Sequence, residues 1–341
     1  MKTPTVEDLP HPPARKVGWP WTVGTDPLPP VMDDDSLWPK ISIVTPSYNQ
    51  GEFLEEAMRS VLLQGYPRLE YIIVDGGSED NSVDIIKKYD KWISYWVSEP
   101  DGGQSYAINH GFRLASGDII AWLNSDDMYK LGVLAHVAKK YLRSYSKDFW
   151  IVMGIEYWDF EKNTKVVDYQ KEKYDLKSWI TGEVNPNQQG TFWSRDLLQR
   201  VGFLKEDLHY GMDKEIFMRL LSKGYKFSTE KVVAAIYRQH GACKWKKGLA
   251  PFKYEWSKIG LSYLPFILPD YRRVISKQLK GELSHVALRL AQDHDKNVFK
   301  RLSYWYESAS VTPRMLLSRT FWGTLVRLAV SGLRRSSLSM H

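Results

Sequence analysis

The sequence predicts an α/β protein with a mostly parallel sheet flanked by helices and an α-helical C-terminal appendage. Short apolar segments typical of buried strands alternate three times with segments of helical periodicity, which indicates a parallel sheet. The fourth strand, Ile119–Leu123, runs directly into Asn124, Ser125 and two acids. Because ligands of such sheets bind beyond the carboxyl ends of the strands, we expect a binding crevice there.

Each expected element has its own signal. Strands are expected at Ile41–Thr45, Tyr71–Val74, Tyr95–Val97, Ile119–Leu123 and, later, Val232–Tyr237. Apolar residues at helical spacing predict helices over Phe53–Val61, from an N-cap at Ser78 to Tyr89, over Gln104–Ala115, and near Tyr271–Ala291 and Pro313–Arg335. The first three strands end in polar or small residues near Tyr48, Asp75 and Glu99, and these residues should line up on one edge of the sheet.

Composition is ordinary for a soluble globular protein. The 341 residues are 43% hydrophobic and 26% charged, and the length allows one large domain plus an appendage. The single cysteine, Cys243, excludes an internal disulfide and a cysteine-based zinc site. No signal peptide and no apolar run of about 18 residues is found, so a cytoplasmic location is expected.

The positive charge is concentrated towards the C-terminus. From Trp245 onward there are 17 Lys and Arg against 6 Asp and Glu, whereas the whole chain has a net charge of only +7. The candidate crevice therefore lies in a part of the chain that is net negative. This distribution weakens a nucleic-acid-binding hypothesis, and no nucleic-acid partner is expected.

The first 39 residues are expected to form an N-terminal arm. They contain nine of the seventeen prolines together with Trp19, Trp21 and Trp38. Proline at this density blocks regular elements, while the tryptophans favour an extended arm lying on the domain over a floppy leader. The expected organisation is an arm over 1–39, a domain over 40–245 and a basic helical extension over 246–341.

Asp126 and Asp127 are candidate metal ligands. Adjacent carboxylates repel each other, and a divalent cation such as Mg²⁺ or Mn²⁺ would relieve that repulsion while binding substrate phosphates. The alternative is a solvated loop that happens to contain two acids. Neither G-x-G-x-x-G after the first strand nor G-x-x-x-x-G-K-[ST] is present, so phosphates would have to be held by a metal.

Three ordered motifs carry a resemblance to a known family. Ser42–Asn49, Val74–Ser78 and Leu123–Asp127 resemble the corresponding motifs of family 2 glycosyltransferases, which have the GT-A fold. The resemblance covers about residues 40–245. It implies transfer of a sugar from a nucleoside diphosphate to a hydroxyl with inversion, and it implies that the acidic motif holds a divalent cation on the diphosphate.

The resemblance also implies roles for individual residues. Nucleotide-sugar binding is expected of Pro46, Tyr48, Asn49, Asp75, Gln104, Asn124, Ser125, Gln189 and Arg238. Asn124 stands where an aspartate is frequent in the family, so one carboxylate is missing. Its amide can still form hydrogen bonds to ribose or sugar, and the metal-binding role is therefore expected of Asp126 and Asp127.

The second half of the chain is expected to supply the acceptor side and the catalytic base. Asn187–Trp193 resembles the segment between donor and acceptor, and Gly211–Glu215 resembles the segment that carries the catalytic acid. Asp213 is the candidate base, because inversion needs a carboxylate to take the acceptor proton. The alternative is a helix N-cap, a position that also favours Asp.

Two residues after the strand at Val232–Tyr237 complete the expected site. A pattern of Arg, any residue and His occurs here in related sequences, and it corresponds to Arg238 and His240. His240 is expected as a third metal ligand, and Arg238 could offset charge on the leaving diphosphate. The alternative is a surface loop with two hydrogen-bonding side chains.

The sequence thus predicts a glycosyltransferase that depends on Mn²⁺ or Mg²⁺. The expected donor is a nucleotide sugar, most simply a UDP-sugar, and the acceptor is a saccharide or a lipid-linked hydroxyl in bacterial cell-surface polysaccharide or glycolipid assembly. The basic amphipathic segment Pro313–Arg335 is expected to lie on an anionic membrane surface or, alternatively, to pack on the domain. A nucleotidyltransferase and a non-catalytic carbohydrate-binding scaffold are the rival functions.

Overall fold

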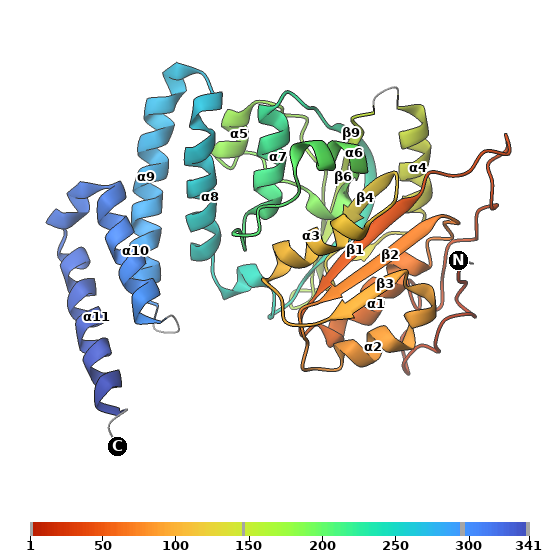
Figure 1. Cartoon of the computed structure of the whole chain (residues 1–341), viewed down its shortest axis with the longest axis horizontal. Helices are drawn as coiled ribbons and strands as arrows, with labels where there is room; N and C mark the ends of the chain where they lie inside the picture. Colours follow the sequence, from red (N-terminus) through yellow and green to blue (C-terminus); the bar gives the residue numbers. More distant parts are fainter. Residues whose placement is uncertain (1–2, 145–146, 294–296, 339–341) are drawn as a thin grey trace. The chain divides into compact units, whose positions relative to one another are not determined.

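The computed structural model describes residues 3–144, 147–293 and 297–338 (Figure 1). Contacts divide the chain into two compact units. The first comprises residues 1–174 and 186–240, and the second comprises residues 175–185 and 241–341. The short segment 175–185 therefore leaves the first unit and joins the C-terminal helices. The expected division at 39/40 and 245/246 stays a prediction.

The first unit is built on one nine-stranded sheet in the order β3-β2-β1-β4-β8-β6-β9-β5, with β7 paired to β6 (Figure 1). The strands are β1 (Ile41–Ser47), β2 (Leu69–Asp75), β3 (Tyr95–Ser98), β4 (Ile119–Trp122), β5 (Met128–Tyr129), β6 (Trp150–Asp159), β7 (Thr164–Asp168), β8 (Thr191–Ser194) and β9 (Ser228–Gln239). The first four strands are parallel, as expected. The later strands add antiparallel pairs, so the sheet is more mixed than the sequence suggested.

Helices cover both faces of the parallel part of the sheet. The helices of this unit are α1 (Gly51–Leu62), α2 (Ser82–Lys88), α3 (Gln104–Leu114), α4 (Val133–Arg143), α6 (Arg195–Val201) and α7 (Met212–Ser222). The expected N-cap of α2 at Ser78 is wrong, because the helix begins four residues later with Asn81 at the N-cap position. The Ser78 hydroxyl instead donates a hydrogen bond to the carboxylate of Asp75.

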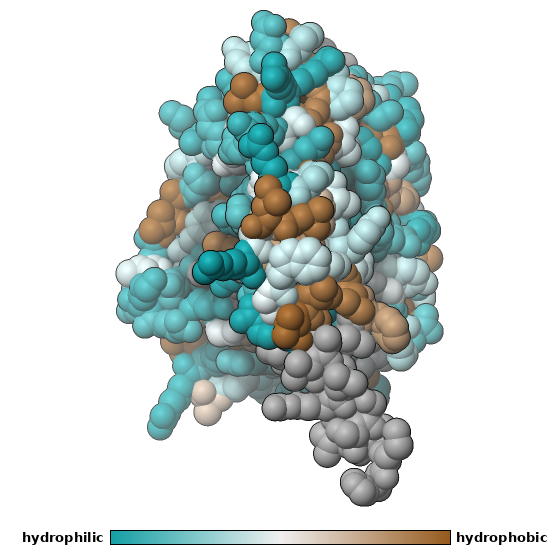
Figure 2. Space-filling view, turned by 90° about the vertical axis from the view of Figure 1, so that its left-hand side faces the viewer, coloured by the Kyte–Doolittle hydropathy of each residue, from teal (hydrophilic) through white to brown (hydrophobic). Residues whose placement is uncertain are grey.

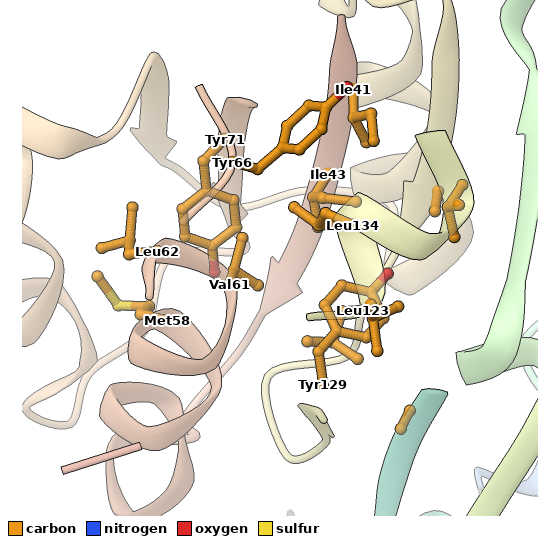
Figure 3. Packing of buried hydrophobic residues seen from close by; sticks show 14 of the residues in the cluster. Ile41, Ile43, Met58, Val61, Leu62, Tyr66, Tyr71, Leu123, Tyr129 and Leu134 are labelled. Carbon is orange, nitrogen blue, oxygen red and sulfur yellow. The ribbon is translucent and has the colours of Figure 1, made fainter. Parts of the chain in front are cut away.

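The main core follows from the period-two alternation of the strands. Ile41 and Ile43 of β1 are fully buried on the face covered by α1, where they join Met58 and Val61 (Figure 3). Val44 points to the other face, against α3. A Cβ added at Gly111 of α3 would lie 2.4 Å from Val44 Cγ1, so this glycine permits close packing of helix and strand.

The N-terminal arm lies on the first unit, as expected. Leu9, Trp21 and Trp38 are buried. Backbone hydrogen bonds from Thr25 N to Leu63 O (3.0 Å) and from Leu28 N to Gly65 O (2.8 Å) join the arm to the residues that follow α1. These contacts exclude the floppy-leader alternative for this part of the arm.

The second unit is helical, as expected for the appendage. Its helices are α5 (Leu176–Ile180), α8 (Ala250–Tyr263), α9 (Pro269–Ala291), α10 (Val298–Val311) and α11 (Arg319–Leu338). Among the helices of the described residues, none is both long and apolar enough to cross a membrane.

The apolar residues of the segment expected to be amphipathic, Pro313–Arg335, are partly buried and partly exposed in the structure. Phe321 is fully buried and stacks on Trp305 of α10 with ring centroids 4.4 Å apart, and Leu328 is buried as well. Leu317 and Trp322 remain exposed. The described part of the helix is therefore partly packed within the second unit, while the side chains from residue 329 onward, including Leu333, lie outside the described set.

Candidate functional site

The carboxyl ends of four parallel strands meet at one edge of the sheet. Ser47, the last residue of β1, pairs with Asp75 at the end of β2, and Asp75 pairs with Ser98 at the end of β3. On the other side of β1, Val44 pairs with Trp122 at the end of β4. The polar residues that follow these strands therefore gather at one edge, as the sequence predicts.

Asp75 organises the two loops beside β1. Its buried carboxylate accepts hydrogen bonds from Ser78 N (2.8 Å), Ser78 Oγ (2.6 Å) and Ser98 Oγ (2.7 Å). Asn49 has a φ of 50°. Its backbone N–H donates a hydrogen bond to Ser78 Oγ, and its side-chain Oδ1 accepts one from Glu79 N. Asp75 and Asn49 thus fix the loop geometry, and their expected contacts with a nucleoside stay predictions.

The two residues at the end of β1 differ in exposure. Pro46 is buried within the sheet, opposite Val74 of β2. The Tyr48 side chain is 60% exposed, so its ring is accessible to a ligand at this edge. Aromatic rings that project from a sheet edge stack readily on a planar base.

Asp127 is the buried member of the acidic pair. Its Oδ2 accepts from Asn124 Nδ2 (3.0 Å) and Gln189 Nε2 (3.1 Å), and its Oδ1 accepts from the backbone N–H of Arg238 (3.2 Å). Burial, followed by the charge of Asp126, raises the pKa of the Asp127 carboxyl. Hydrogen bonds from Asn124 and Gln189 act against burial, because they favour the charged form. The three hydrogen bonds together fix the position of the Asp127 carboxyl group.

Asn124 and its neighbours explain the departure from the family's acidic motif. The side-chain Oδ1 of Asn124 accepts a hydrogen bond from Gln104 Nε2 (2.8 Å), and its Nδ2 donates one to Asp127. The amide therefore acts as an acceptor and as a donor. An aspartate at this position could not donate, and it would add a third charge beside Asp127. Gln188 supports the same turn by donating to the carbonyl of Trp122 (2.8 Å).

Asp126 is the accessible member of the pair, and it faces His240. The side chain of Asp126 is 21% exposed, and its Oδ2 lies 3.4 Å from His240 Nε2. The imidazole stacks on Phe53 of α1 with ring centroids 3.9 Å apart, which fixes its plane. Two ligands of one octahedral ion at about 2.1 Å each lie roughly 3 Å apart, so this oxygen and nitrogen fit a shared divalent cation.

Arg238 holds the backbone of the acidic turn. Its fully buried guanidinium donates from Nε to the Asp126 carbonyl and from Nη2 to the Ser125 carbonyl (3.4 Å). Nη1 forms an ion pair with Glu56 of α1, and Nη2 also donates to the Phe53 carbonyl (3.0 Å). The surface-loop alternative for Arg238 and His240 is therefore wrong, and a contact of Arg238 with diphosphate stays a prediction.

Asp213 does not cap its helix. The N-cap of α7 is Gly211, so Asp213 is the second helical residue, and its Oδ1 accepts from the amide of Lys214 (2.7 Å). Burial, together with the smaller effects of the charges of Asp168, Asp213 and Asp127, raises the pKa of Tyr157 to about 12. Asp213 and Asp127 therefore both lie within electrostatic reach of one tyrosine.

Sequence reasoning missed two residues of this site. Glu56 is not among the site residues that the sequence predicts, although it is the counter-ion of Arg238. The sequence predicts Phe53 only as an apolar residue of its helix, yet its ring lies against both His240 and the guanidinium of Arg238. The available signal was an acid three residues after an aromatic on a largely buried helix, a spacing that puts both on one face.

Two solved structures resemble this fold, which matches the GT-A type of glycosyltransferases. S. aureus TarS 1–349, solved with UDP-GlcNAc, has a TM-score of 0.55 and 15% identity, and the match covers 81% of this chain and 82% of that chain. The mannosyltransferase PcManGT from Pyrobaculum calidifontis, solved with GDP-Man and Mn²⁺, has a TM-score of 0.50 and 17% identity, over 92% of this chain and 90% of that chain. At such identities these likenesses show the fold alone, and they confirm the expected fold class.

Comparison by sequence points to one family. Residues 42–201 match the family described as glycosyl transferase family 2, so this stretch of the chain is similar to those enzymes. TuaG of Bacillus subtilis, named as a teichuronic acid biosynthesis glycosyltransferase, is 39% identical over 95 residues, which are 27% of this chain and 38% of that protein. A glycosyltransferase of Rickettsia typhi is 27% identical over 195 residues, and the chain spans 61% of its length.

The burial difference between the two acids generates a stability prediction. Asp127→Asn places an NH₂ group against one of three hydrogen-bond donors. At a pH above the raised Asp127 pKa of about 8, where the carboxyl is ionised, we therefore expect a loss of about 1–3 kcal/mol in the free energy of unfolding. Asp126→Asn, at a partly exposed position, should cost less than about 1 kcal/mol. Chemical denaturation of both variants without metal measures the difference. An Asp127→Asn protein as stable as the wild type would mean that the buried carboxyl is already protonated.

Proposed function

We propose that this chain transfers a sugar from a nucleoside-diphosphate sugar to a hydroxyl acceptor, with inversion and with the help of a divalent cation. The observation that carries the proposal is the pairing of Asp126 with His240 at the end of β4, within a family 2 domain. The site combines one accessible carboxylate, one imidazole and one buried carboxylate that fixes the turn. Such a set suits a cation that is shared with a diphosphate.

Asp126 and His240 are the residues that would hold the cation. Mg²⁺ binds through oxygen ligands, whereas an imidazole nitrogen suits a transition metal better, so the pair favours Mn²⁺. When bound, the ion would stabilise negative charge on the leaving diphosphate. In this proposal Asp127, with no exposed surface, orients the turn rather than binding the ion directly.

The donor is proposed to lie along the edge formed by the ends of β1, β2 and β4. The exposed ring of Tyr48 would stack on the base, and the loop fixed by Asp75 and Asn49 would surround the ribose. The two neighbouring structures hold UDP-GlcNAc and GDP-Man, respectively, which supports a nucleotide sugar without selecting the base. We propose a UDP-sugar as the first donor to test.

Asp213 is the proposed base. The acceptor oxygen attacks the anomeric carbon, the bond from that carbon to the diphosphate oxygen breaks, and the acceptor proton passes to the Asp213 carboxylate. Attack from the face opposite the leaving group inverts the configuration. The partly exposed side chain of Asp213 at the start of α7 is compatible with access by an acceptor.

A cell-surface saccharide or a lipid-linked hydroxyl is the proposed acceptor. The name of TuaG refers to teichuronic acid biosynthesis, and the 39% identity over 95 residues makes a related polymer a reasonable first choice. We accordingly propose a role in bacterial cell-surface polysaccharide or glycolipid assembly, at the cytoplasmic face of the membrane.

A panel of nucleotide sugars incubated with Mn²⁺ tests the proposed function against its rivals. A glycosyltransferase should release nucleoside diphosphate from at least one donor, slowly with water and faster with a suitable acceptor. A nucleotidyltransferase would instead release pyrophosphate from a nucleoside triphosphate and a sugar phosphate. Binding of nucleotide sugar with no turnover under any acceptor condition would favour the non-catalytic scaffold.

Asp213→Asn should lower the transfer rate by about 100-fold or more while donor binding is kept, because a positioned base contributes roughly 10²–10⁴-fold. Transfer assays with saturating donor measure the loss, and calorimetry with UDP checks binding. Asp168→Asn, which also removes a charge near Tyr157, is the matched control and should keep most of the activity. Equal losses in both variants would contradict the assignment of the base.

We also propose that α11 contacts an anionic membrane surface. Arg319, Trp322 and Val326 follow the i, i+3, i+7 spacing of one helix face, and all three are exposed. Apolar side chains gather among polar ones on the face in Figure 2, which looks onto the side of the C-terminal helices in Figure 1. An aromatic residue with a flanking arginine suits the boundary between headgroups and acyl chains.

Val326→Ser should reduce co-sedimentation of the full chain with anionic vesicles at low salt. Val166→Ser is the control, because both valines are 62% exposed and Val166 lies on β7. We expect several-fold weaker binding for the α11 variant and an unchanged affinity for the control, since membrane affinity scales with buried apolar area. A wild-type protein that stays in the supernatant with phosphatidylglycerol vesicles would end this proposal.

A further inference from the structure

We infer that the N-terminal arm positions the acidic turn of the active site through Glu56 and Arg238. Three arm residues, Lys16, Trp19 and Trp21, are here called the arm brace. All the contacts involved lie within the first unit. The inference rests on the proposed function for its catalytic meaning, whereas the physical link can be tested on the protein alone.

The arm brace reaches Glu56 by two polar contacts. Trp21 Nε1 donates to Glu56 Oε1 at 2.8 Å, and Lys16 Nζ forms an ion pair with the same oxygen at 2.9 Å. Trp21 is buried, and the Glu56 side chain is only 17% exposed. Both arm residues therefore hold one oxygen of a largely buried carboxylate.

The other oxygen of Glu56 faces the site. Glu56 Oε2 pairs with Arg238 Nη1, and the same guanidinium donates to the carbonyls of Asp126 and Ser125. The backbone amide of Arg238 donates to Asp127 Oδ1. One arginine thus contacts three consecutive residues of the acidic turn, and its orientation is set by the carboxylate that the arm holds.

A second contact from the arm reaches the same turn from its far end. Trp19 Nε1 donates at 2.8 Å to the carbonyl of Tyr129, which lies two residues after Asp127. Tyr129 pairs with Ala235 of β9, the strand that also carries Arg238. The arm brace therefore fixes the backbone on both sides of Asp127, and it does so without approaching the exposed carboxylate of Asp126.

The arm is itself firmly anchored, which makes it suitable as a support. Arg59 of α1 is fully buried and donates to three arm carbonyls, those of Pro10 (2.9 Å), Pro20 (2.9 Å) and Trp21 (2.8 Å). A buried guanidinium whose donors are used in this way strongly favours one path of the chain. The rigid support and the two contacts with Glu56 together make these arm residues positioning residues.

Removal of single donors from the arm brace tests the inference. Trp21→Phe deletes the N–H while keeping an aromatic ring, and Lys16→Met deletes the charge at a half-exposed position where folding is not at risk. Trp38→Phe is the matched control, because this buried arm tryptophan donates at 3.0 Å to Pro29 O rather than to Glu56. Glu56→Gln serves as the partner for a double-mutant cycle with Trp21→Phe.

Two readouts separate positioning from general stability. Hydrogen exchange without metal should become faster at residues 125–129 in Trp21→Phe and Lys16→Met, but not in Trp38→Phe. Mn²⁺ affinity, measured by the paramagnetic signal of the free ion, should fall by up to about tenfold in the same two variants, in line with effects of residues beyond the metal ligands. When Trp21→Phe is added to Glu56→Gln, the further change in the exchange rate at residues 125–129 and in Mn²⁺ affinity should be small.

The outcomes distinguish this inference from the proposed function. Faster exchange in all three variants alike, or in none of them, would overturn the positioning role. A wild-type protein that binds no Mn²⁺ would count against the proposed metal dependence, while the exchange comparison would still decide the role of the arm.

Discussion

The site depends on one constraint, the need to compensate a carboxylate that has no contact with water. Asp127 is fully buried beside a second acid, and a buried charge is costly unless hydrogen bonds and opposite charge surround it. Asn124, Gln189 and the amide of Arg238 donate to it, and the Arg238 guanidinium lies close by. Every segment around the turn therefore contributes to holding Asp127, and the neighbouring Asp126 is left partly exposed towards His240.

This constraint joins parts of the chain that are distant in sequence. Glu56 of α1 balances Arg238 of β9, and the N-terminal arm holds Glu56. The result is a preorganised turn, whose carboxylate can meet a cation without a large rearrangement. Preorganised polar groups are the main source of charge stabilisation in enzymes of this kind. The second, helical unit has exposed apolar and basic residues, among them Trp322, Val326 and Arg319 of α11.

Much of the parallel sheet could be predicted from sequence, because each strand is a short apolar run ended by polar residues. The helix expected over Gln104–Ala115 corresponds to α3, and the strand expected over Val232–Tyr237 lies within β9. The burial of Arg238 could not be predicted, since its counter-ion Glu56 lies 182 positions away. The cap assigned to Ser78 failed because a nearby buried carboxylate competes for its hydroxyl. Which apolar residues of α11 are buried could not be predicted, because Phe321 packs against Trp305 of α10.

The most direct test of the account is calorimetric titration of the full chain with UDP in the presence of Mn²⁺, in the presence of Mg²⁺ and after chelation with EDTA. We expect UDP to bind in the presence of Mn²⁺ and to bind about tenfold or more weakly once the ion is removed, since the diphosphate would lose its bridge to Asp126 and His240. Mg²⁺ should support weaker binding than Mn²⁺, because one of the two proposed ligands is a nitrogen. Equal affinity with and without divalent cation, or no UDP binding under any condition, would contradict the account.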